Sequence, residues 1–196
     1  MITRPLVATG ARVVAIEPDA QFAARLARAC PDARVVRRDV RIFAWPTEPF
    51  SVVANLPFAH ASEICRALLT DPALPLVSLD AIVEWDFAIK RARVWPSTVT
   101  SVIWSAWYEL AIVRRLPPST FVPPPRVAAA VFRARRRNEP LVPLEEARAF
   151  GSFVAAAFRA GRVPGLGRGL LPRDLDAHAW AALWQERPRS RVTSNR

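Results

Sequence analysis

Cysteine is scarce in this sequence, and long apolar runs are absent. The 196 residues contain two cysteines, Cys30 and Cys65, whose spacing fits neither a zinc site nor a disulfide framework. No apolar stretch approaches the roughly 20 residues that span a bilayer, and no signal-peptide core follows Met1. These absences argue against membrane-spanning, secreted disulfide-rich and zinc-finger proteins. We expect a protein of the reducing cytoplasm that binds no metal ion.

Lysine is almost absent as well. Lys90 is the only lysine, and arginine supplies the rest of the positive charge. Lysine and arginine number 28 against 17 acidic residues, which gives a formal net charge of +11. A protein this basic usually binds polyanions, so charge favours nucleic acid or an anionic membrane surface as partner. Arginine suits bidentate contacts with phosphate and guanine, although a GC-rich genome would also replace lysine codons by arginine codons.

Short β-rich runs alternate with helical segments in the first two thirds of the chain, which is typical of a layered α/β sheet. The predicted strands cover residues 12–16, 34–36, 50–54 and 79–83. Two further β-like runs, 110–116 and 127–134, flank a proline-rich segment. They predict an antiparallel hairpin at the edge of the sheet.

The helical segments indicate where the sheet domain ends. The expected helices cover residues 19–29, 62–69, 145–160 and 174–185. Composition changes after the arginine run that ends at Arg137, so we assign residues 1–137 to the sheet domain. We expect residues 138–196 to form a small helical, RNA-contacting subdomain whose tail, 187–196, is frayed.

Each of the four predicted strands ends in a polar residue, namely Glu17, Asp39, Asn55 and Glu84. In open α/β sheets the ligand lies outside the carboxyl ends of the strands, because the loops there are free to vary. The sequence therefore predicts a ligand site at this edge of the sheet.

The most specific stretch is Asn55-Leu56-Pro57-Phe58, directly after a predicted buried strand. It resembles the catalytic motif of adenine-N6 methyltransferases, and chemistry explains the residue types. An exocyclic amine is a weak nucleophile because its lone pair is delocalised into the ring. The Asn55 side-chain oxygen and a backbone carbonyl beside Pro57 can accept both N6–H bonds and free that lone pair, while proline fixes the backbone. Phe58 offers a flat face to an extruded base, although it also fits a core position after a turn.

The order of motifs along the chain strengthens this resemblance. Glu17 and Asp39-Val40 follow successive strands, Asn55-Leu56-Pro57-Phe58 comes next, and the segment from Phe121 to Val127 reads Phe-x-Pro-x-Pro-x-Val. The chain is thus similar to the rRNA adenine-N6 methyltransferases, above all to the erythromycin-resistance methylases, which are related to the dimethyladenosine transferases. The resemblance implies a Rossmann-like class I methyltransferase sheet.

The resemblance also implies a role for each matched residue. Glu17 would bind ribose hydroxyls of S-adenosyl-L-methionine, and Asp39 with Val40 would hold its adenine. Asn55 would contact both this cofactor and the target amine, and Phe58 and Phe121 would hold the target base. The implied reaction transfers methyl to an adenine of 23S rRNA.

One part of the family pattern has no match in the sequence. The glycine-rich loop that cradles the methionine half of the cofactor is absent, and Ile2 to Leu6 resembles the helix that follows it. We therefore expect the first strand to be missing from the sheet. It would leave a gap of two ~4.8 Å spacings between the strands that end at Glu17 and Asn55. Weak binding of S-adenosylmethionine is expected as a result.

Arginines near the hairpin are the candidate RNA contacts. The set comprises Arg114, Arg115, Arg133, Arg135, Arg136 and Arg137. At a sheet edge in a chain of this charge, such residues can grip phosphates, although an arginine run is more often a solvated patch. The expected partner is ribosomal RNA, of the large subunit above all. We expect no membrane partner, and we expect the protein to be a monomer.

Three functions stay open on the sequence. The first is the resistance-type 23S methyltransferase, and the second is a housekeeping relative that acts on small-subunit rRNA. The third is a non-catalytic RNA-binding remnant, which the absent glycine loop makes realistic. His60 and the Glu84 and Asp86 pair are weaker catalytic candidates, and Cys65 fits core packing.

Overall fold

A computed structural model describes residues 2–93, 95–165 and 169–187 as two separate β-sheets with helices around them. In the smaller sheet, β1 (Val14–Ile16) pairs in parallel with β2 (Arg34–Val36). The larger sheet has the order β3-β4-β6-β5, formed by β3 (Phe50–Asn55), β4 (Leu76–Glu84), β6 (Ala129–Arg136) and β5 (Tyr108–Leu116). β3 and β4 are parallel, while β6 is antiparallel to both of its neighbours. The α/β class and the predicted edge hairpin are confirmed.

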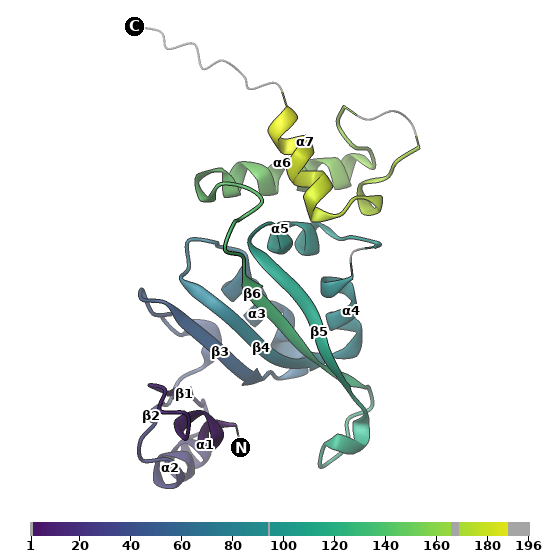
Figure 1. Cartoon of the computed structure of the whole chain (residues 1–196). Coiled ribbons are helices and arrows are strands. Elements are labelled where there is room, and N and C mark those ends of the chain that lie inside the picture. The colour runs from purple at the N-terminus through teal and green to yellow at the C-terminus, as the bar shows by residue number, and fades with distance from the viewer. Residues whose placement is uncertain (1, 94, 166–168, 188–196) are drawn as a thin grey trace, which may run out of the picture.

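The helices lie at three levels of an elongated molecule (Figure 1). The α-helices are α1 (Thr3–Val7), α2 (Ala20–Ala29), α3 (Ala61–Leu69), α4 (Trp85–Ala92), α5 (Val99–Trp107), α6 (Ala147–Ala160) and α7 (Ala177–Glu186). Short 3-10 helices are η1 (Val40–Ile42), η2 (Phe58–His60), η3 (Pro118–Thr120), η4 (Leu144–Glu146) and η5 (Pro172–Asp174). Helices α1 and α2 accompany the small sheet, α3 and α4 lie behind the large sheet, and α5 to α7 gather at the opposite end.

Local sequence signals account for several helix ends. The Asp19 side chain accepts hydrogen bonds from the Gln21 and Phe22 amides at 2.8 Å, which caps α2 as its position predicts. Gly161 ends α6 with a φ of +64°, a left-handed conformation that glycine adopts without steric penalty.

The sequence analysis did not assign α4 and α5. In α5 the side chains of Val102, Trp104, Ala106 and Trp107 are all buried, so the helix is apolar over most of its circumference. A helix without a polar face shows no 3.6-residue alternation, and its β-branched and aromatic residues favour strand in a local interpretation.

The main core lies between the large sheet and the helices behind it and continues into α6 and α7. From Leu79 to Glu84, strand β4 alternates, with Leu79, Ala81 and Val83 buried and the residues between them partly exposed. The Trp107 and Phe150 rings meet edge to face at 5.9 Å, which joins α5 to α6. The C-terminal helices therefore share their core with α5. The domain boundary at residue 137 stays an expectation, and residues 188–196 of the expected frayed tail lie outside the described residues.

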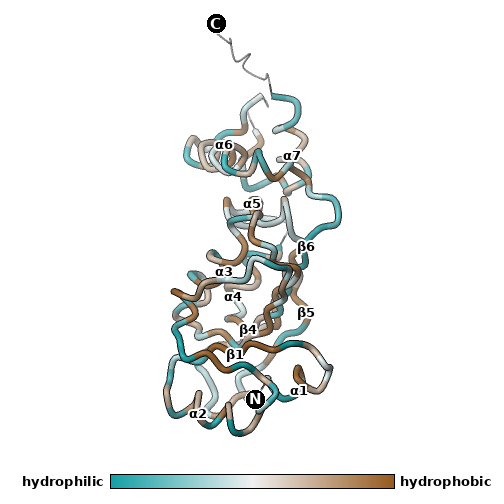
Figure 2. The backbone as a smooth tube through the Cα atoms, turned by 90° about the vertical axis from the view of Figure 1, so that its left-hand side faces the viewer, coloured by the Kyte–Doolittle hydropathy of each residue, from teal (hydrophilic) through white to brown (hydrophobic). Residues whose placement is uncertain are grey.

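The gap that the sequence predicts in the sheet is present, because β1 and β3 are not hydrogen-bonded to each other. A cavity of about 1470 Å³ lies between the two sheets. Figure 2 shows hydrophobic residues along β1 as well as along the large sheet, yet Val14 is 42% exposed and Val53 is 43% exposed. Apolar strand surface thus faces the cavity from both sides. Among the described helices, none combines the length and apolar character needed to cross a membrane.

Candidate active site

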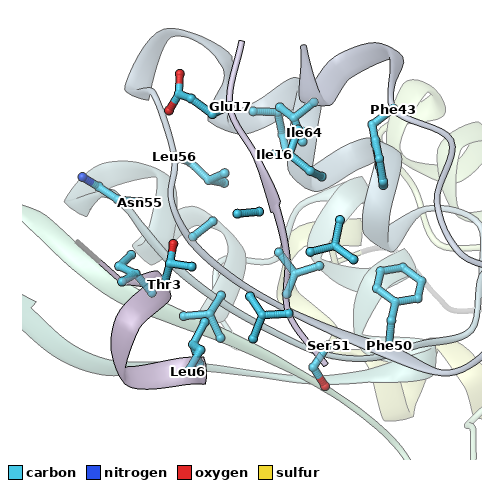
Figure 3. A pocket seen from close by; sticks show the side chains of 18 of the residues that line it. Thr3, Leu6, Ile16, Glu17, Phe43, Phe50, Ser51, Asn55, Leu56 and Ile64 are labelled. Atoms are coloured by element: carbon cyan, nitrogen blue, oxygen red, sulfur yellow. The ribbon is translucent and has the colours of Figure 1, made fainter. Parts of the chain in front are cut away.

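The carboxyl ends of β1, β2 and β3 meet at the cavity between the sheets. Its lining includes most of the predicted site: Glu17, Asp39, Val40, Asn55, Leu56 and Pro57. Figure 3 shows Glu17 and Asn55 toward one end of the cavity, with Phe43 and Phe50 at the other. The structure therefore brings two acids, an amide and a proline to the lining of one cavity, with Glu17 and Asn55 toward the same end.

Glu17 is held at the end of β1 by the chain itself. Its amide donates to the Val36 carbonyl at 3.1 Å, which continues the β1–β2 ladder. Its Oε1 atom accepts from the Asp19 amide at 3.0 Å, and no described residue hydrogen-bonds Oε2. One carboxylate oxygen is thus available to accept hydrogen bonds from a ligand in the cavity.

Asp39, by contrast, is occupied by its near neighbour Arg41. Oδ1 accepts from the Arg41 amide at 2.9 Å, and the Arg41 guanidinium donates from Nη2 to Oδ2 at 2.6 Å and from Nε to both oxygens. The hydrogen bonds from the Arg41 side chain, and then from its amide, lower the pKa of Asp39 from 3.8 to about 2. Asp39 stays ionised, but its acceptor positions are largely used by Arg41.

Arg41 also connects this acid to the loop that follows the Asn-Leu-Pro-Phe segment. Its Nη1 atom lies 3.9 Å from Glu63 Oε2, and that oxygen lies 3.6 Å from His60 Nδ1. Arg41 is not predicted from the sequence, because an arginine two residues after an aspartate forms no recognisable motif. Only the 3-10 turn of η1, which Asp39 caps, folds the guanidinium back onto the carboxylate.

The four residues of the Asn-Leu-Pro-Phe segment have different environments. Asn55 is exposed at the last position of β3, where it pairs with Ile82 of β4. Leu56 is buried in the main core, and its amide donates to the Ile82 carbonyl at 3.2 Å. Pro57 is extended, with a φ of −62°, and starts the turn of η2. The Leu56 side chain thus packs in the core, and its backbone carbonyl is the group that can hydrogen-bond a ligand.

The two aromatic residues predicted to hold a target base lie outside the cavity lining. Phe58 is the first residue of η2 and is partly buried. Phe121 follows η3 in the loop between β5 and β6, which projects beyond the sheet in Figure 1. Their role in holding a base stays a prediction.

Three of the six candidate RNA-binding arginines are engaged within the protein. Arg133 Nε donates to Asp80 at 2.7 Å. Arg136 donates to the carbonyls of Leu76, Pro72 and Leu74 and to the Tyr108 hydroxyl. Arg137 donates to the Ser105 carbonyl at 2.9 Å and lies 3.8 Å from Glu109. The guanidinium groups of Arg136 and Arg137 thus tie strand ends to neighbouring loops, and their contact with RNA stays a prediction.

The other arginines of that set are exposed. Arg114 and Arg135 make no ion pair or side-chain hydrogen bond among the described residues. The Arg115 guanidinium lies over the Trp85 ring at 4.9 Å from its centroid. This stack stands where β4 ends and α4 begins, at the same edge of the sheet as Asn55. Among the tryptophans, Trp104, Trp107, Trp180 and Trp184 are buried.

The chain matches the family model described as "Ribosomal RNA adenine dimethylase" over residues 1–163. The chain belongs to this family. The match includes Glu17, Asp39 and the Asn55 to Phe58 segment, so every predicted cofactor and catalytic position lies within it.

Three relatives illustrate the dimethylase family. An "rRNA adenine N-6-methyltransferase" of Corynebacterium diphtheriae is 34% identical over 81% of this chain and 63% of its own length. The "Mycinamicin-resistance protein MyrB" of Micromonospora griseorubida is 30% identical over 94% of this chain and 66% of its own length. A "Ribosomal RNA small subunit methyltransferase A" of Synechococcus is 32% identical over 93% and 69%. The chain thus spans less than two thirds of the first two relatives.

A solved structure supports the fold. The crystal structure of the 23S rRNA methyltransferase ErmE has a TM-score of 0.77 and 23% identity, covering 89% of this chain and 81% of that one. At this identity the likeness shows the fold alone, which is a Rossmann-like methyltransferase architecture.

Proposed function

We propose that the chain is an rRNA adenine-N6 methyltransferase that takes methyl groups from S-adenosyl-L-methionine. The observation that carries the proposal is the shared cavity: Asn55 and Pro57 at the end of β3 line the same space as Glu17 and Asp39. Membership of the dimethylase family indicates the class of reaction, and the cavity is the proposed site of that reaction. The cavity volume, about 1470 Å³, exceeds the range of about 300–1,000 Å³ that is usual for single-ligand pockets. Part of this volume is the gap between the unpaired strands β1 and β3, so the proposed ligand site is the end of the cavity at Glu17 and Asn55.

The residues present fit the adenosine half of S-adenosylmethionine. The free Oε2 of Glu17 is an acceptor suited to ribose hydroxyls, and Val40 and Ile16 offer apolar contact to an adenine ring. Asp39 fits adenine only if Arg41 yields part of its hydrogen bonding. When bound, this cofactor would supply an electrophilic methyl group.

Asn55 has the central role in the proposed chemistry. Its side-chain oxygen, exposed at the end of β3, would accept one hydrogen bond from the adenine amine. The Leu56 carbonyl, held in direction by Pro57, would accept the other. Both hydrogen bonds favour the tetrahedral nitrogen that forms during methyl transfer over the planar nitrogen of the free adenine. They therefore lower the activation barrier of methyl transfer and do not raise the affinity for the substrate.

The proposed substrate is 23S rRNA, and the proposed outcome is protection against macrolides. The relative MyrB, named for mycinamicin resistance, supports this choice. The small-subunit methyltransferase relative supports the alternative, an adenine of small-subunit rRNA. A host that expresses the protein and gains macrolide resistance would support the first, and transfer only to small-subunit rRNA would support the second.

Methyl transfer from radiolabelled S-adenosylmethionine to isolated 23S and 16S rRNA tests the reaction directly. Asn55→Ala should reduce turnover about 10²- to 10³-fold, by analogy with the removal of one transition-state hydrogen bond, while RNA affinity and melting temperature stay unchanged. Phe58→Tyr should retain most activity, since it keeps the flat face, and Phe58→Ala should weaken base capture by about 1–3 kcal/mol.

Two results would contradict the proposal. Full activity in a well-folded Asn55→Ala protein would remove asparagine from the mechanism. Undetectable transfer by the wild-type chain, together with intact RNA binding, would favour the non-catalytic RNA-binding remnant.

A further inference from the structure

A second polar cluster lies on the far side of α3 from the cavity. Ile64 and Leu68 of α3 line the cavity. Arg66 and Thr70 are each two residues further along, which places them about 200° around the helix, on its opposite face. Thr70 Oγ1 accepts from the Trp104 Nε1 of α5 at 3.1 Å.

Arg91 of α4 completes this cluster. Its guanidinium carbon lies 5.7 Å from the centroid of Trp104 and 5.3 Å from that of Phe87. Its Nε atom is buried and, within the described residues, is the one buried side-chain nitrogen or oxygen that lacks a hydrogen-bond partner. A buried donor without an acceptor is unfavourable, and such groups in folded proteins usually have an ion or a water as partner.

No anionic side chain balances the charge of the cluster. Neither Arg66 nor Arg91 forms an ion pair with a described residue. Burial lowers the pKa of Arg91, and the nearby Arg66 lowers it further. Cys65 supplies no counter-charge, because burial raises the pKa of its thiol to about 12. Trp104 thus contacts both Arg91 and Thr70, and the guanidinium groups of Arg66 and Arg91 have no anionic partner among the described residues.

We propose that Arg66, Thr70 and Arg91 form a site for a phosphodiester group of the RNA substrate. The inference rests on the proposed function, because that function brings an RNA backbone to this face. Arginine binds phosphate oxygens with charge-assisted hydrogen bonds, and the Trp104 and Phe87 rings hold the Arg91 guanidinium in one orientation before binding. Helix α3, whose Ile64 and Leu68 line the cavity, separates the cluster from it. We expect one RNA to place an adenine in the cavity and a phosphate elsewhere along its backbone on this cluster.

RNA binding as a function of salt tests the site, with a short adenine-containing RNA hairpin as probe. Arg91→Met keeps the length of the side chain and removes its charge, and Arg66→Gln removes the second guanidinium. Each should weaken binding about tenfold at low salt. Each should also flatten the slope of log K against log salt by about 0.7 to 0.9, the contribution of one phosphate contact. Arg28→Gln, at an exposed position of α2 with the same charge change, is the control.

Thermal melting and a conservative variant separate this role from packing. If the cluster awaits an anion, inorganic phosphate should raise the melting temperature of the wild type and not that of Arg91→Met. Arg91→Lys should keep the salt slope but recover only part of the affinity. RNA affinities of both variants equal to that of the Arg28→Gln control would overturn the site and leave the methyl-transfer proposal intact. Stabilisation by phosphate with no change in RNA binding would identify a site for free anions and overturn the RNA assignment.

Discussion

The region from Thr3 to Ile42 and the region from Phe50 to Glu186 are built with very different amounts of core. In the first, the buried hydrophobic residues are Ala23, Cys30 and Ala33, all small. In the second, complete tryptophan, phenylalanine and leucine side chains fill the space between the sheet and its helices. Yet both regions contribute to the candidate site, since Glu17 and Asp39 come from the first and Asn55 from the second. The site therefore combines a well-packed half with a weakly packed one.

Hydrogen exchange should show the largest difference between the regions. Amides of Ala15 and Val36 belong to a two-stranded sheet with one face on the cavity, and we expect them to exchange through local opening. Amides of Ala81 and Phe132 lie in the centre of the large sheet and should exchange only on global unfolding, at about 5–15 kcal/mol. Equal protection in both sheets would show that the small sheet is as firmly held as the large one.

Truncation of a core aromatic residue should have the next largest effect. Trp107 is buried, contacts Phe150 and donates from Nε1 to the Val142 carbonyl at 3.0 Å. Trp107→Ala should lower the free energy of unfolding by about 3–5 kcal/mol in denaturant titrations. The control Trp95→Ala removes a ring that is 64% exposed and should change it by less than about 1 kcal/mol. A small loss for Trp107→Ala would mean that α5 and α6 are joined less tightly than the contacts indicate.

A pair of neighbouring arginines should then separate structural from ligand-binding roles. Arg136 donates to three backbone carbonyls, so Arg136→Met should cost about 1–3 kcal/mol of stability by leaving buried carbonyls unpaired. Arg135 is exposed on the other face of β6, so Arg135→Met should leave stability unchanged and weaken RNA binding. Chemical denaturation and RNA titration of both variants check this. A stable Arg136→Met protein with weakened RNA binding would support the RNA-binding role that the sequence predicts for Arg136.

The sequence sufficed where the pattern is local. The cap at Asp19 and the motif at Asn55 depend on neighbouring residues or on resemblance. The structure shows the cap and places Asn55 in one cavity with the strand-end residues Glu17 and Asp39. The sequence failed where long-range contacts decide. The backbone partners of Arg136 lie about 60 positions away in the chain, and α5 is apolar over most of its circumference because α6 and α7 cover it. The hydrogen bonds from Arg41 to Asp39 depend on the single 3-10 turn η1, and no periodicity in the sequence predicts that turn.

The smallest effect concerns this Asp39–Arg41 pair, which lies in the weakly packed region. Because the pKa of Asp39 is lowered from 3.8 to about 2, the pair stabilises the fold fully above pH ~4, and this stabilisation is lost as the pH falls through 2. The pair is exposed, so the change in unfolding free energy should be small, and carboxyl chemical shifts in an NMR titration are the suitable measurement.

Arg41→Gln removes the guanidinium and should return the pKa of Asp39 toward 3.8. It should also free the Asp39 carboxylate, so S-adenosylmethionine should bind more tightly in calorimetry, whereas Asp39→Asn should bind it less tightly. Arg38→Gln is the control, since it makes the same charge change one residue before Asp39 without entering the pair. Weaker binding by Arg41→Gln than by this control would mean that Arg41 itself helps to hold the cofactor, and that Asp39 serves to orient it.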